Sequence, residues 1–103
     1  MADSIMQSRK ECLVCGSGNV EQHHVLFGNP RRKYADQDGL WVWICRKCHE
    51  TNKDSVHLDP SHIKDHYLQR LAQETLIKQY VRQGYPADVA RDMFLQRYGR
   101  FFD

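Results

Sequence analysis

The sequence has no long apolar run, no large excess of charge of either sign, no internal repeats and no low-complexity tracts. Its first residues, Met-Ala-Asp-Ser-Ile-Met-Gln-Ser-Arg, lack the hydrophobic stretch of a secretory signal, and no later segment is apolar over the length of a membrane span. We therefore expect a soluble, cytoplasmic protein without a membrane partner, in which cysteine thiols stay reduced. A net charge of +2 means that composition alone does not identify a nucleic-acid-binding protein.

The chain is also short. Its 103 residues predict one domain, and a bound metal ion commonly supplements the limited hydrophobic core of a chain this size. We expect a single domain over residues 1–103. Residues 12–57 would form a metal-bound unit, and residues 58–103 would form a helical tail packed on it.

The four cysteines occur as two pairs. Cys12-Leu-Val-Cys15 and Cys45-Arg-Lys-Cys48 are C-x-x-C hooks, and residues 16–44 lie between them. Four thiolates make up the ligand set of a closed tetrahedral zinc site, so all four cysteines are predicted ligands of a structural Zn²⁺. Two disulfides in a secreted domain are an alternative that the tight C-x-x-C spacing disfavours. A thiol oxidoreductase is disfavoured because neither hook has a thioredoxin-like context and because four cysteines are one redox pair too many.

The segment between the hooks predicts two strands. Residues 20–27 alternate in polarity and contain His23 and His24, which point to opposite faces of a regular strand. Residues 40–44, Leu-Trp-Val-Trp-Ile, are branched and aromatic, as is typical of a strand. Gly-Asn-Pro ends the first strand, and residues 31–39 are predicted to form a polar loop.

Helices are predicted after the second strand. A short one follows the second hook, from about Arg46 to Asp54. Another starts at Asp59-Pro60-Ser61, with Asp59 as its N-cap, and ends at Gly84. A last helix runs from about Pro86 to Tyr98 and stops at the following glycine. The predicted fold class is therefore α+β, a small zinc-stapled ββα finger followed by two C-terminal helices.

The order of these elements resembles a known family. A His-bearing strand, a basic loop, a second strand and a helix opening with C-x-x-C-H are similar to the HNH endonucleases of the His-Me finger (ββα-metal) superfamily. The likeness is strongest to small phage and prophage proteins with a four-cysteine zinc site, and it covers about residues 12–57. It implies a metal-dependent DNA endonuclease or nickase that hydrolyses phosphodiester bonds in a bacterial host, with a structural Zn²⁺ and a catalytic Mg²⁺ or Mn²⁺.

The resemblance also implies roles for three histidines. His24 matches the general base, and His23 and His49 match ligands of the catalytic ion. The chemistry agrees, because imidazole titrates near neutral pH and can accept a proton from the attacking water. A divalent ion neutralises the charge that develops at the scissile phosphate.

Two positions depart from the family pattern. The residue that orients the base is usually Asn, and here Asp38 is the nearest candidate, with Asn29 a weaker one. Some members carry a further histidine where this chain has Lys53, and His57 is a candidate ligand from the following loop.

Arg31, Arg32 and Lys33 stand together and are candidate DNA-phosphate contacts. Simple solvated loop charges are the alternative. The predicted partner is double-stranded DNA, and a chain this small would take its target choice from DNA structure, homodimerisation or a protein partner.

The alternative function is a non-catalytic zinc-ribbon DNA-binding or adaptor module. The absent Asn favours that alternative, whereas the retained His-His and C-x-x-C-H motifs argue against it.

Overall fold

The structure consists of two paired strands with short helical segments, followed by two longer helices. It is a computed structural model, and it describes residues 2–26, 28, 30–51, 53, 55–56 and 58–102. The elements in order are β1 (Val20–His24), α1 (Arg31–Asp38), β2 (Trp41–Cys45), η1 (Lys47–Thr51), α2 (Ile63–Arg82) and α3 (Ala87–Tyr98). The predicted α+β class is confirmed, with two antiparallel strands, following helices and four clustered cysteines.

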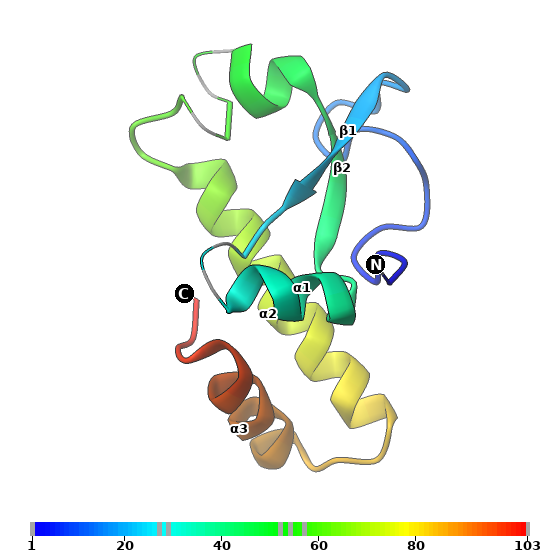
Figure 1. Ribbon diagram of the computed structural model, residues 1–103, viewed down its shortest axis with the longest axis vertical. Helices are drawn as coiled ribbons and strands as arrows, with labels where there is room; N and C mark the ends of the chain where they lie inside the picture. Colours follow the sequence, from blue (N-terminus) through cyan, green and yellow to red (C-terminus); the bar gives the residue numbers. More distant parts are fainter. Residues whose placement is uncertain are drawn as a thin grey trace.

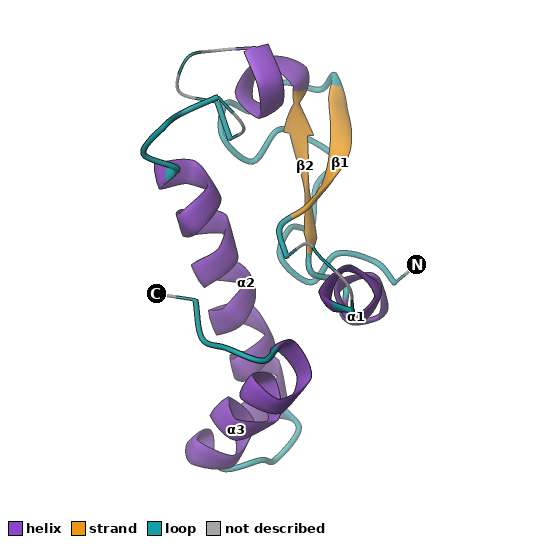
Figure 2. Cartoon of the chain, turned by 60° about the vertical axis from the view of Figure 1, so that its left-hand side comes forward, coloured by secondary structure: helices purple, strands orange, loops and turns teal. Residues whose placement is uncertain are grey.

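The hairpin pairs β1 with β2 in antiparallel register, with Val20 opposite Cys45 and His24 opposite Trp41. Figure 2 shows η1 beyond one end of this hairpin and α1 at the other. The predicted first strand is too long, because pairing stops at His24 and the next two residues, Val25 and Leu26, turn into the core. Burying these two apolar side chains stabilises the turn more than two further ladder bonds would.

Residues 31–38 form helix α1, so the predicted polar loop is wrong. Arg, Lys, Ala and Gln are good helix formers, and Gly39 ends the helix in a left-handed conformation (φ 75°) with its N–H bonded to Ala35 O. A Cβ at this glycine would lie 2.2 Å from the carbonyl oxygen of Asp3. The close approach of the N-terminal segment therefore requires glycine here.

The N-terminal segment packs along α1 and β2. Ala2 N–H donates to Asp36 O (3.0 Å), and Ile5 N–H donates to Gly39 O (2.9 Å). The indole Nε1 of Trp41 donates to Ala2 O (2.9 Å). Residues 2–5 are thus part of the folded unit.

The helical tail forms an antiparallel hairpin in which α3 turns back along α2 (Figure 1). The predicted cap of the first tail helix is displaced, since Asp59 binds the backbone N–H and hydroxyl of Ser61 (3.0 and 2.7 Å) and α2 begins at Ile63. The end of α3 is as predicted, with Gly99 left-handed at φ 81°.

One core joins the hairpin to the tail. Its largest fully buried apolar side chains come from both halves of the chain: Val25, Leu26, Leu40, Val42, Ile44, Val56, Leu68, Leu76, Phe94 and Tyr98. None of the helices in the described part of the chain has the length and apolar character needed to cross a membrane.

Candidate functional site

The four cysteines meet at the η1 end of the hairpin. Cys12 and Cys15 lie in a turn that is closed by the bond from Cys12 N–H to Ser17 O (2.8 Å). Cys45 is the last residue of β2, and Cys48 lies in η1. Cysteines 30 to 36 residues apart in sequence are therefore brought together by the pairing of the two strands.

The cysteine geometry fits a zinc ion. All four Sγ atoms lie within 4.8 Å of one another, and those of Cys15 and Cys45 are 3.5 Å apart. A tetrahedral site with Zn–S bonds of about 2.3 Å needs sulfur separations of about 3.8 Å. Small side-chain adjustments reach that geometry, so the predicted set Cys12, Cys15, Cys45 and Cys48 could hold a structural zinc.

The ionisation of the thiols supports the same conclusion. Burial acts to raise the pKa of Cys12, but backbone hydrogen bonds from Cys45, Cys15 and Val14 bring it down to about 6, below the ordinary 9.0. Burial, followed by contact with the neighbouring thiols, raises the pKa of Cys48 well above 9.0. The Cys12 thiolate forms easily and Cys48 resists ionising beside it, so a divalent cation that binds the thiolates together would do so with release of protons.

A second cluster lies on the hairpin face that carries Glu21 and His23. His49 Nδ1 is 2.6 Å from Glu21 Oε1 and 3.7 Å from Glu50 Oε1. The rings of His23 and His49 have centroids 4.8 Å apart at an interplanar angle of 59°. The hydrogen bond with His49 lowers the pKa of Glu21 below 4.5. The structure thus brings the predicted ligands His23 and His49 into ring contact.

This cluster contains carboxylates that the sequence analysis did not single out. The ligand atoms of Glu21, His49 and Glu50 lie within 4.8 Å of one another, so these three residues could hold a metal ion. Glu21 could have been found from the strand period, since it is two residues before His23 and shares its face. His57, the remaining predicted ligand, lies outside the described residues.

His24 lies on the other face of β1 and contacts α1. Its Nε2 is in hydrogen-bond contact with Asp36 Oδ1, and its side chain is 16% exposed. With an ionised carboxylate as partner, Nε2 carries the proton and donates it, which leaves Nδ1 as the acceptor nitrogen of the ring. Neither of the metal-binding groups found among the described residues includes His24.

The carboxylate next to His24 is Asp36, which corrects the expectation that Asp38 has this position. Asp38 Oδ2 accepts hydrogen bonds from Arg97 Nε and the Tyr98 hydroxyl, each at 2.6 Å. The two aspartates differ because residues 31–38 form a helix, in which side chains two positions apart point in directions about 200° apart. Asp36 therefore faces β1, and Asp38 faces α3. Asn29, the weaker candidate, lies outside the described residues.

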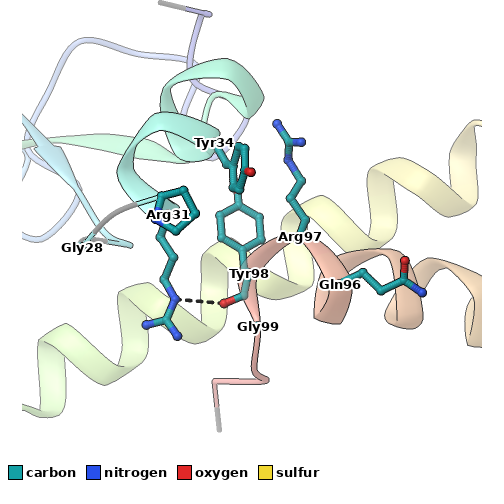
Figure 3. Close-up of a pocket in the computed structure, with 8 residues that line it drawn as sticks. Gly28, Arg31, Tyr34, Gln96, Arg97, Tyr98 and Gly99 are labelled. Carbon is teal, nitrogen blue, oxygen red and sulfur yellow. Dashed lines mark hydrogen bonds between the residues drawn. The ribbon is translucent and has the colours of Figure 1, made fainter.

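The three predicted DNA contacts differ in their surroundings. Arg31 is half-buried, and its Nε donates to Tyr98 O at 2.9 Å (Figure 3). Arg32 and Lys33 are exposed. They lie four and three residues before Asp36, so they share its face of α1.

Comparison with known protein families, curated proteins and solved structures finds no match to this chain.

Proposed function

We propose that the chain is a metal-dependent phosphodiester hydrolase that cuts DNA, as its resemblance to HNH endonucleases implies. The observation that carries the proposal is the contact between His24 and Asp36 on a strand whose preceding residue, His23, packs on His49. A carboxylate-bound imidazole and a histidine–carboxylate cluster on adjacent strand positions are the two parts that hydrolysis of a phosphodiester needs.

His24 is the proposed general base. Asp36 fixes the ring through Nε2. Nδ1 then accepts the proton of the attacking water, and the carboxylate stabilises the imidazolium that results. A ring that is 16% exposed is reachable by water and is still held in one orientation.

His49 and His23 would hold the catalytic Mg²⁺ or Mn²⁺. Glu21 fixes the His49 ring through Nδ1, so an ion would bind the other nitrogen, Nε2, in a carboxylate–histidine–metal arrangement. A bound ion would neutralise the charge that develops on the phosphate and the leaving oxygen.

Arg32 and Lys33 would contact the phosphate backbone of double-stranded DNA. Both are exposed on the face of α1 that carries Asp36, which places positive charge beside the proposed base. Arg31 contributes less, because its guanidinium is already engaged by the Tyr98 carbonyl.

The test is cleavage of supercoiled plasmid with Mg²⁺, Mn²⁺ or EDTA. We expect His24→Ala to lower the rate by about two to four orders of magnitude, the contribution of a positioned base, at unchanged zinc content. His49→Ala should abolish the response to divalent ions because a ligand is lost. His66→Ala is the matched control, since this histidine is exposed on α2 and belongs to neither metal-binding group found among the described residues.

A non-catalytic zinc-containing DNA-binding module is the second candidate. It is favoured by the position of His24 on the opposite face of β1 from the His23–His49 cluster. A wild-type protein that binds DNA and cuts none with any divalent ion would establish this second function and refute the first.

A further inference from the structure

Helix α1 is too short to be stable without tertiary contacts. It has eight residues, and no side chain caps its N-terminus. Isolated helices shorter than about 12 residues are marginal in water, because nucleation fixes several residues for a single hydrogen bond. The position of every side chain on α1, including Asp36, therefore depends on what holds the helix.

Both ends of α1 are held by the last turn of α3. At the N-terminal end, Arg31 Nε donates to Tyr98 O (2.9 Å), as Figure 3 shows. At the C-terminal end, Asp38 accepts bonds of 2.6 Å from Arg97 Nε and from the Tyr98 hydroxyl. Between these ends, the rings of Tyr34 and Tyr98 meet edge to face with centroids 6.3 Å apart.

The contacts of Arg97 are directed at α1. Besides Asp38, its guanidinium donates to Gln37 Oε1 (3.0 Å) and lies over the ring of Tyr34, 4.4 Å from the centroid. Burial opposes the charge on Arg97, but the bond to Asp38 and the attraction of that carboxylate raise its pKa above the ordinary value of an arginine. The ion pair is thus a firm link between α3 and α1.

The opposite face of α1 carries the residue that touches His24. Asp36 lies between Arg31 and Asp38 in sequence and points away from α3 toward β1. The N-terminal segment binds backbone oxygens on this side, those of Asp36 and of Gly39 at the end of the helix, whereas the side chains of Arg31 and Asp38 are bound by α3.

We infer that Arg97 and Tyr98, the last two residues of α3, are positioning residues for the His24–Asp36 pair and act on it through α1. Their significance for catalysis rests on the proposed function. The helical tail is then more than packing for the cysteine-containing finger, because it holds in place the carboxylate that contacts the ring of His24.

The test compares Arg97→Ala and Tyr98→Phe with Arg91→Ala. Arg91 is the matched control, since its guanidinium also lies over an aromatic ring, that of Phe101 at 4.7 Å, and it is exposed on α3. The tautomer of His24 is measured by ¹⁵N NMR at a fixed, mildly alkaline pH. We expect a single Nε2–H form in the wild type and in Arg91→Ala, and a mixture of tautomers in the other two variants.

Cleavage is measured on the same samples. A base displaced by about 1 Å can cost about 100-fold in rate, so we expect losses of about 10- to 100-fold for Arg97→Ala and smaller ones for Tyr98→Phe. Arg97→Lys, which retains the charge, should recover part of the loss. Tyr98→Phe removes only a hydroxyl. If Arg97→Ala does not fold, Tyr98→Phe alone tests whether α3 positions the His24–Asp36 pair.

A wild-type tautomer of His24 in folded Arg97→Ala and Tyr98→Phe would overturn the inference and leave α3 a purely structural role. If the wild-type protein cuts no DNA, the proposed function fails, and the tautomer comparison still decides whether α3 positions His24.

Discussion

Two aspartates two positions apart serve different purposes in this chain. Asp36 is 39% exposed and meets His24, whereas Asp38 is 15% exposed and binds Arg97 and Tyr98. A half-exposed carboxylate on an imidazole can be replaced at little cost to folding. A largely buried carboxylate with two donors cannot, because its loss leaves those donors without an acceptor.

This difference predicts opposite phenotypes. Asp36→Asn should lower plasmid cleavage by about 10- to 100-fold, as is usual when the partner of a functional histidine is changed, with little change in unfolding free energy. Asp38→Ala should lower the unfolding free energy by about 1–3 kcal/mol. Urea denaturation and cleavage rates measured on both variants check this, and equal losses of stability would contradict the distinction.

At the scale of elements, the strands and cysteine hooks could be predicted from the sequence because their signals are local. Alternating residues predicted β2, and C-x-x-C spacing predicted the four cysteines that the structure brings together. Helix α1 could not be predicted in this way, because Arg97 and Tyr98, the residues that anchor it, are 59 and 60 residues from Asp38 in sequence. For the same reason Asp36 was not identified as the partner of His24, since the choice between Asp36 and Asp38 depends on the helical twist.

The anchor on Tyr98 should make stability depend on alkaline pH. Burial, and then the bond to Asp38, raises the pKa of Tyr98 above its ordinary 10.0. The folded-state pKa exceeds the unfolded one, so this contribution is fully present below about pH 10 and is lost as the pH rises further.

We therefore expect the unfolding free energy of the wild type to fall more steeply between about pH 10 and pH 12 than that of Tyr98→Phe. Urea titrations across this range measure the slopes. Tyr67→Phe serves as the control, because Tyr67 is 59% exposed on α2. Parallel curves for wild type and Tyr98→Phe would show that this hydroxyl does not support the fold.

The exposed face of α1 gives a prediction about DNA. Each phosphate contact releases counterions, so Arg32→Ala combined with Lys33→Ala should reduce the slope of log affinity against log salt by about 2. Lys78→Ala with Arg82→Ala is the matched control, a pair of exposed basic residues on α2. Binding measured by fluorescence anisotropy at several salt concentrations distinguishes the two pairs, and equal slopes would reduce Arg32 and Lys33 to solvated charges.

At the scale of the whole molecule, the cysteine cluster joins the N-terminal turn to both β2 and η1. We expect about one Zn²⁺ per chain by elemental analysis, because binding energy at such a site is largely folding energy. Removing zinc with a strong chelator should abolish cooperative thermal unfolding, and adding it back should restore it. A zinc-free chain, or a Cys48→Ser variant with the wild-type melting temperature, would contradict a structural zinc.

The long sequence separation between α1 and its anchors has a consequence for synthesis on the ribosome. Both cysteine hooks and the two strands are translated well before Arg97 and Tyr98, which follow Asp38 by 59 and 60 residues. At a translation rate of about 5–20 residues per second, the residues that hold α1 are synthesised about 3 to 12 s after α1 itself. The half that contains the cysteine cluster can close during that interval. If Arg97 and Tyr98 position α1, the pairing of His24 with Asp36 is completed only when the last turn of α3 has been made.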